Sequence, residues 1–212
     1  MVTAFAFDIG ETLVRDDRYW GRWADWLDIP RHTLSALVGA VVAQGRDNAD
    51  ALRMLRPDID TAAEYDAREA AGKGEELEEG DLYPDVRPTL GGLRAAGFRV
   101  VIAGNQTSKM GELLRALDLP ADRIVTSGEW GVAKPDPEFF ARVAEAAGAA
   151  PHQIVYVGDH PANDVEPART AGLRTAHLRR GPWGNLWADA PEAEAADWRI
   201  DSLHDLLAVD FG

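Results

Sequence analysis

Three aspartates and one lysine stand where short apolar runs of the sequence end or give way to loops. Asp8 directly follows the first run. Asp159 and Asp164 follow the fourth run, and Lys134 lies in a loop before it. Carboxylates that meet at one edge of a sheet repel one another, and a hard divalent cation with oxygen ligands relieves that repulsion. Magnesium is the expected cation. With the lysine it would neutralise a bound phosphoryl group and let an anionic carboxylate approach it.

Lys134 is distinguished by composition, because the chain has 22 basic residues and the only lysines among them are Lys73, Lys109 and Lys134. Arginine is therefore the usual cation of this chain. A lysine flanked by Ala133 and Pro135, in a segment that must be a loop, indicates a site that needs a compact point charge. The alternative is an ordinary surface lysine.

The elements that must position these residues follow from the apolar pattern. Runs typical of buried strands lie at residues 3–7, 98–103, 123–126, 154–157 and 174–178, and helical patterns lie between them at 86–96, 109–117, 137–147 and 162–171. Gly97, Gly148 and Gly172 stand just past three of the helices, where a left-handed cap favours glycine. The alternation predicts an α/β fold with a doubly wound parallel sheet, in which ligands bind beyond the carboxyl ends of the strands.

One stretch interrupts this alternation. From about residue 14 to residue 82 the apolar spacing is helical and no strand is predicted, so we expect a small helical insertion. Pro84 marks the return of the chain to the main domain. The predicted domains are therefore a core of residues 1–13 and 84–212 and a helical domain of residues 14–83.

Composition limits the partners. The formal net charge of −14 repels the phosphate backbone of nucleic acids and anionic lipid surfaces, and no basic patch reverses it locally. We therefore expect neither a nucleic acid nor a membrane as a partner. The absence of cysteine excludes thiolate chemistry and disulfides. No apolar run approaches the roughly 20 residues that span a bilayer, and no secretory signal is evident, so a cytoplasmic location is expected.

Four segments resemble, in order, the motifs of the haloacid dehalogenase-like superfamily. Residues 7–13, FDIGETL, resemble the first motif, which has an aspartate, any residue, usually a second aspartate, glycine and threonine. Residues 100–105, VVIAGN, resemble the second, residues 131–137, GVAKPDP, the third, and residues 157–164, VGDHPAND, the fourth. The resemblance covers residues 5 to about 206. It implies a Rossmann-like core with a small helical cap inserted after the first motif.

The resemblance also implies roles for individual residues. Asp8 is expected to be the nucleophile and a magnesium ligand, Asp159 a second ligand, and Asp164 a direct ligand or an outer support. Lys134 is expected to orient Asp8 and the phosphoryl group. The backbone carbonyl of Gly10 is a further expected magnesium ligand.

Gly10 departs from the motif, because most phosphatases of the family have there the aspartate that protonates the leaving oxygen and later activates water. Loss of that acid and base is expected to cost ~10²- to 10⁴-fold in rate. Glu11 either replaces it as a catalytic acid through its longer side chain or points outward and only tunes the field. Thr12 is expected to support the loop by hydrogen bonding at the substrate-binding site.

A second departure is Gly104, which stands where the second motif normally has a serine or threonine that contacts the phosphoryl oxygens. The neighbouring Asn105, Gln106 and Thr107 are the candidates to bind substrate in its place.

Two further features keep two interpretations each. Trp20, Trp23 and Trp26 recur at helical spacing in the insertion, either as core packing or as an apolar wall over a substrate. Arg180 follows the fifth predicted strand and either touches an anionic substrate or lies in a surface loop.

The favoured function is hydrolysis of a small phosphorylated molecule by a Mg²⁺-dependent phosphatase, because the full set of aspartates and the lysine is present. Dehalogenation at a carbon centre also uses an aspartate nucleophile and needs no acid at position 10, but it needs no metal either. A third possibility, supported by Gly10 and Gly104, is a catalytically weakened domain that binds a ligand or a partner. Substrate identity and oligomeric state are left open.

Overall fold

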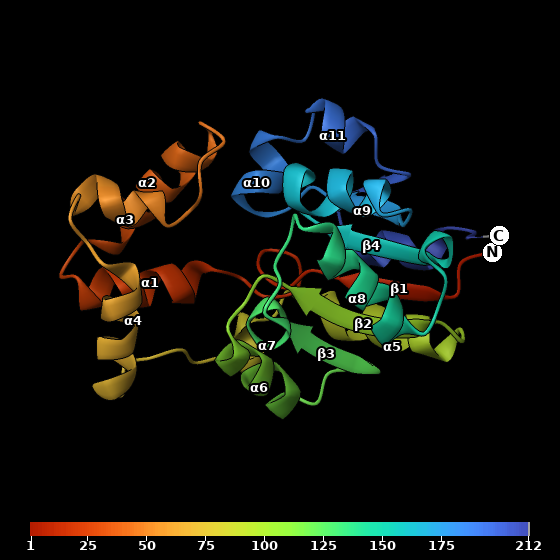
Figure 1. Ribbon diagram of the computed structural model, residues 1–212, viewed down its shortest axis with the longest axis horizontal. Coiled ribbons are helices and arrows are strands. Elements are labelled where there is room, and N and C mark those ends of the chain that lie inside the picture. The colour runs from red at the N-terminus through yellow and green to blue at the C-terminus, as the bar shows by residue number, and fades with distance from the viewer. Residues whose placement is uncertain (212) are drawn as a thin grey trace. The chain divides into compact units, whose positions relative to one another are not determined.

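The sheet of the core has six parallel strands in the order β3-β2-β1-β4-β5-β6 (Figure 1). The structure is a computed structural model that describes residues 1–211. Its strands are β1 (Ala4–Phe7), β2 (Arg99–Gly104), β3 (Arg123–Thr126), β4 (Ile154–Gly158), β5 (Arg174–Leu178) and β6 (Trp198–Ile200). This topology confirms the predicted α/β, Rossmann-like fold. Because β1 lies between β2 and β4, the carboxyl ends of β1 and β4 are adjacent, at the point where such sheets bind ligands.

Helices connect the strands, as the sequence pattern predicts. Those of the core are α5 (Val86–Ala95), α6 (Ser108–Ala116), α7 (Ser127–Trp130), α8 (Pro137–Ala147), α9 (Glu166–Thr170), α10 (Gly181–Leu186) and α11 (Pro191–Glu194). Short turns of helix lie at η1 (Glu79–Asp81), η2 (Pro151–Gln153), η3 (Pro161–Val165) and η4 (Leu203–Ala208). The pattern over 162–171 predicted one α-helix, whereas the structure has the π-helical turn η3 followed by the shorter α9.

Local chemistry explains where α8 begins and ends. Asp136 precedes it and accepts a hydrogen bond from the backbone N–H of Glu138 at 2.8 Å, while Pro137 occupies the first turn. Gly148 ends the helix with φ of 60°, a left-handed conformation that favours glycine. The strand β6 has no such strong signal, because it has three residues and its central Arg199 is exposed.

The two faces of the sheet carry different side chains. Ala4 and Ala6 of β1 belong to a buried cluster with residues of α8 and α9, among them Phe139 and Phe140. Phe5 faces the other way and packs edge-on against Phe98 and Phe211, with ring centroids 5.1 and 4.9 Å apart. Small residues on one face let α8 lie close to the strand, and large ones on the other fill a deeper layer. Both faces are thus buried, as a parallel sheet requires.

The chain divides into two compact units, Met1–Arg15 with Glu78–Gly212, and Asp16–Leu77. The second unit consists of α1 (Asp17–Trp26), α2 (Arg31–Val42), α3 (Asp50–Leu55) and α4 (Thr61–Ala70) (Figure 1). Within it, Trp23 lies under the guanidinium of Arg68, which is 4.3 Å from the ring centroid, and Trp26 donates a hydrogen bond to Glu64 at 2.6 Å. These two tryptophans therefore join α1 to α4. A role for this unit as a cap stays a prediction.

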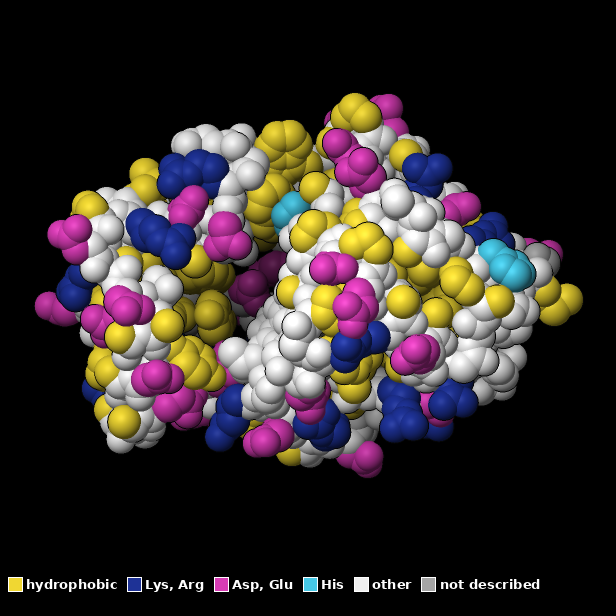
Figure 2. All heavy atoms as spheres, in the orientation of Figure 1, with side chains coloured by type: hydrophobic (Ala, Val, Ile, Leu, Met, Phe, Trp, Pro, Cys, Tyr) yellow, Lys and Arg dark blue, Asp and Glu magenta, His cyan; other side chains and the backbone are white. Residues whose placement is uncertain are grey.

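Charged side chains of both signs are interspersed on the face that Figure 2 shows. Several form local ion pairs, such as Arg142 with Glu138 and Arg94 with Asp122 at 3.0 Å. Exposed pairs of this kind contribute about 0–1 kcal/mol each to stability. Among residues 1–211, none of the helices has both the length and the apolar character needed to cross a membrane.

Candidate active site

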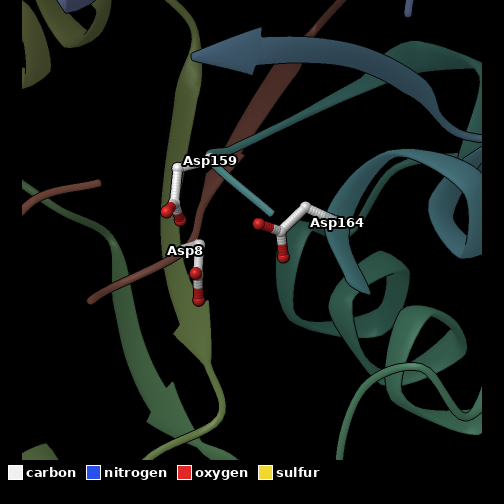
Figure 3. A group of neighbouring side chains, drawn as sticks. All are labelled: Asp8, Asp159 and Asp164. Carbon is white, nitrogen blue, oxygen red and sulfur yellow. The ribbon is translucent and has the colours of Figure 1, made fainter. Parts of the chain in front are cut away.

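Three buried carboxylates converge at the carboxyl edge of the sheet (Figure 3). Asp8 follows β1, Asp159 follows β4, and Asp164 comes from η3. One carboxylate oxygen from each lies within 4.8 Å of the others. Residues far apart in the sequence thus meet because parallel strands β1 and β4 end side by side. The structure brings together the aspartates that the sequence singled out.

Lys134 lies among these carboxylates. Its Nζ is 2.6 Å from Asp8 Oδ1 and 2.6 Å from Asp164 Oδ1, and only 3% of its side chain is exposed. The backbone of Lys134 is fixed by Asn105, whose Nδ2 donates to the lysine carbonyl at 2.9 Å and whose Oδ1 accepts from the lysine N–H at 2.8 Å. The backbone that carries this lysine is therefore held in place by the residue that directly follows β2.

The site has an excess of negative charge. Burial raises the pKa of Asp8 to about 6, against the opposing effect of Lys134 and with a further contribution from Asp164. Burial and the neighbouring carboxylates Asp164 and Asp8 raise the pKa of Asp159 well above its ordinary value. Burial disfavours the charge of Lys134, but Asp164 and Asp8 outweigh it and hold its pKa well above the ordinary value. Three carboxylates and one ammonium thus fit an additional cation with oxygen ligands.

Two glycines allow the carboxylates to approach the sheet closely. A Cβ atom at Gly158 would collide with the carboxylate and the Cβ of Asp164, and a Cβ at Gly104 would collide with Oδ1 of Asp8. The absence of a side chain at Gly104 is therefore a steric requirement of this arrangement, in addition to the loss of a hydroxyl. Asp164 is fixed further, because its Oδ2 accepts a hydrogen bond from the backbone N–H of His160 at 2.9 Å.

The candidate substrate-binding residues lie after β2, but their polar groups have other contacts. Asn105 holds Lys134, as described. The backbone N–H of Gln106 donates to Ser127 Oγ at 3.1 Å. The hydroxyl of Thr107 caps α6 by accepting from the backbone N–H of Met110 at 3.0 Å. These contacts shape the loop after β2.

The loop after β1 carries Gly10, Glu11 and Thr12. Glu11 has φ of 51°, its N–H donates to the carbonyl of Val14 at 2.7 Å, and its Oε2 accepts from the Tyr83 hydroxyl at 2.5 Å. The hydroxyl of Thr12 donates to Asp159 Oδ1 at 3.5 Å. Thr12 therefore supports the loop next to a carboxylate of the site, and the Glu11 side chain is directed to Tyr83.

Two histidines near the site were assigned no role from the sequence. His177 lies beneath it, with Nε2 donating to the carbonyl of Asp159 at 3.2 Å, and burial lowers its pKa. The His160 ring stacks on Trp183 with centroids 3.7 Å apart. Arg180, for which the sequence left open a substrate contact or a surface loop, lies between β5 and α10 with 11% of its side chain exposed, pairs with Asp85 and donates to the carbonyl of Thr12 at 2.8 Å. Its position after a strand was the available signal.

Comparison with known proteins identifies relatives of this chain. The sequence profile of a family described as haloacid dehalogenase-like hydrolase matches residues 2–172. A glyceraldehyde 3-phosphate phosphatase of Methanopyrus kandleri is 35% identical over 60% of this chain and 55% of its own length. A phosphoglycolate phosphatase of Escherichia coli K12 is 36% identical over 63% of this chain and 53% of its own length. The chain thus spans about half the length of these curated relatives.

A solved structure supports the fold over nearly all of the described residues. The crystal structure of a predicted phosphoglycolate phosphatase from Haemophilus somnus 129pt superimposes with a TM-score of 0.72 at 22% identity, covering 98% of this chain and 97% of that one. At that identity the likeness concerns the fold. The family profile spans β1 to the end of α9, and so includes Asp8, Lys134, Asp159 and Asp164. The chain belongs to the haloacid dehalogenase-like hydrolase family.

Proposed function

We propose that this protein is a Mg²⁺-dependent phosphatase that hydrolyses a small phosphorylated molecule through a phosphoryl group carried transiently on Asp8. The observation that supports it most directly is the position of Lys134 between Asp8 and Asp164, with Asp159 completing a buried acidic cluster. A nucleophilic carboxylate beside a fixed ammonium and a cation site suits attack on an anionic phosphoryl group. The names of the relatives from Methanopyrus and Escherichia support the same reaction class.

The proposed cation ligands are Asp8, the backbone carbonyl of Gly10, Asp159 and Asp164. The cluster fits Mg²⁺ because its donors are oxygen atoms and its charge exceeds what Lys134 neutralises. When bound, Mg²⁺ would supply charge neutralisation and polarise a phosphoryl oxygen. His160 and Thr12 hold Asp164 and Asp159 through the hydrogen bonds described above.

The chain's own residues then account for both halves of the reaction. A carboxylate oxygen of Asp8 attacks phosphorus as the bond from phosphorus to the leaving oxygen breaks, and the leaving group departs with that electron pair. Lys134 stays protonated and balances the charge. Water subsequently cleaves the acyl phosphate and returns Asp8 to a carboxylate. Glu11 is the candidate acid and base, and the leaving-group test below examines that role. The loop of Gly104, Asn105, Gln106 and Thr107, together with Thr12, is the proposed contact for the substrate.

Metal removal tests this function. We expect the protein to hydrolyse p-nitrophenyl phosphate, to lose that activity to background when chelated with EDTA, and to recover it with added Mg²⁺. Release of halide from a haloacid, with or without metal, would instead indicate the dehalogenase. No activity in either assay would favour a domain that only binds a ligand or a partner.

The leaving group provides a second test, because Gly10 lacks the usual acid. Aryl and acyl phosphates should be cleaved ~10²- to 10⁴-fold faster than alkyl phosphates, since an alkoxide needs a proton in the transition state and a phenolate or carboxylate needs little. The measurement is kcat/KM over a series of phosphate esters with leaving groups of graded acidity. If alkyl esters turn over as well as aryl esters and Glu11→Gln selectively slows them, Glu11 supplies the proton. Equal rates on alkyl and aryl esters that Glu11→Gln leaves unchanged would contradict this expectation and point to an acid elsewhere in the chain.

A further inference from the structure

Arg180 is a largely buried arginine that joins three segments of the core. It follows β5 and directly precedes α10, and 11% of its side chain is exposed. One terminal nitrogen donates to the carbonyl of Thr12 at 2.8 Å, the other pairs with Asp85, and the guanidinium carbon is 4.0 Å from the ring centroid of Tyr83. The two donors and the flat face of one guanidinium are therefore used at once, which a lysine cannot reproduce.

Asp85 gives this arginine a fixed support. Its Oδ2 also accepts from Ser202 Oγ at 2.9 Å and from the backbone N–H of Leu203 at 2.9 Å, where η4 begins. Burial opposes ionisation of Asp85, but these hydrogen bonds and Arg180 outweigh it and hold its pKa below the ordinary value. The carboxylate is thus an anchored anion, and it determines where the guanidinium lies.

Arg180 also contacts the loop that follows β1. It holds the carbonyl of Thr12, and the hydroxyl of the same threonine donates to Asp159 Oδ1 at 3.5 Å. Tyr83, which lies against the guanidinium, donates to Glu11 at 2.5 Å. Both residues that follow Gly10 are therefore fixed, one directly and one through Tyr83, by the same side chain.

We propose that Arg180 is a positioning residue that holds the turn of residues 10–13, and through it Asp159, in the arrangement that binds Mg²⁺ and the phosphoryl group. The inference rests on the proposed function, because it concerns the same site. Groups that orient metal ligands from the outside typically change metal affinity or activity by about 10- to 100-fold when they are removed. Arg180 acts on Gly10 and Asp159 indirectly, because its own side-chain contacts are with Thr12, Asp85 and Tyr83.

The test compares Arg180→Lys and Arg180→Ala with wild type, and uses Arg179→Ala as a matched control. Arg179 is the preceding residue and forms an ion pair with Asp201 at 2.6 Å, but 55% of its side chain is exposed. Mg²⁺ affinity is measured by isothermal titration calorimetry without substrate, and kcat and KM are measured with p-nitrophenyl phosphate. We expect Arg180→Lys to stay folded, to bind Mg²⁺ about 10- to 100-fold more weakly and to lose kcat more than KM changes. Added guanidinium should restore part of the loss in Arg180→Ala, and Arg179→Ala should resemble wild type.

The outcomes separate this inference from the proposed function. Unchanged Mg²⁺ affinity and kcat in folded Arg180→Lys would overturn the positioning role while leaving the phosphatase intact. A wild type that shows no turnover, but whose Mg²⁺ affinity falls on Arg180→Lys and not on Arg179→Ala, would overturn the phosphatase and support the positioning role. If Arg180→Ala does not fold, Arg180→Lys alone decides. A wild type that binds no Mg²⁺ overturns the inference.

Discussion

Asp8→Asn is expected to reduce phosphate-ester hydrolysis to background, a loss on the order of 10⁴- to 10⁶-fold, as for other residues that bond covalently to a substrate. The amide keeps the size of the carboxylate but cannot attack phosphorus as an anion. It also removes one charged oxygen ligand from the acidic cluster. Initial rates with p-nitrophenyl phosphate at saturating Mg²⁺ measure the effect.

The same substitution should not harm the fold. Burial raises the pKa of Asp8 from 3.8 to about 6, so the folded protein favours the neutral carboxyl more than the unfolded chain does. The resulting stabilisation is fully present below pH 3.8 and is lost as the pH rises through about 6. At pH 7 the ionised carboxylate therefore destabilises the metal-free protein, and asparagine removes that charge. We expect Asp8→Asn to melt in EDTA at or above the wild-type temperature.

A matched control for Asp8→Asn is Asp189→Asn, because the side chain of Asp189 is 91% exposed and pairs only with Arg199 at 3.1 Å among the ion pairs of residues 1–211. It should leave both rate and melting temperature unchanged. Hydrolysis by Asp8→Asn above background would exclude the covalent mechanism, whereas loss of activity together with loss of the fold would leave the chemical role of Asp8 unproved.

Lys134→Met is expected to have the second large effect. The substitution keeps an apolar stem next to the ring of Tyr156, whose centroid is 5.5 Å from Nζ, but removes the charge that lies between Asp8 and Asp164. Leaving buried charges without their partner costs about 3–5 kcal/mol of stability, so thermal unfolding of the metal-free protein should occur at a much lower temperature. Loss of a fixed positive charge at the developing anion should lower kcat by about 10²- to 10³-fold.

Binding of orthovanadate, a phosphate analogue, tests the role of Lys134 apart from turnover. We expect at least about tenfold weaker affinity in Lys134→Met at saturating Mg²⁺, because the protein is acidic and this ammonium is buried at the site. The control is Lys109→Met, since Lys109 is exposed on α6. Unchanged vanadate affinity in a folded Lys134→Met variant would show that this lysine only neutralises its two aspartates.

The order of strands and helices was accessible from the sequence because apolar periodicity and glycine caps are local signals. Residues 123–126 and 174–178 were predicted as strands and form β3 and β5 with those bounds. The elements that the sequence did not predict correctly are short or irregular segments. β6 has only three residues, and Pro161–Val165 form a π-helical turn in a segment where apolar spacing indicated an α-helix. Such short or irregular elements depend on tertiary contacts more than on periodicity.

The sequence by itself determined which carboxylates meet, because Asp8 and Asp159 each follow a parallel strand and such ends share one edge of the sheet. Only the tertiary structure decided the side-chain contacts that hold the site in place. The pairing of Arg180 with Asp85, 95 residues away, and the clamp of Asn105 on the backbone of Lys134 leave no periodic trace in the sequence. Strand order places a residue at an edge, whereas a hydrogen bond depends on the direction and reach of one side chain, which packing of distant segments sets.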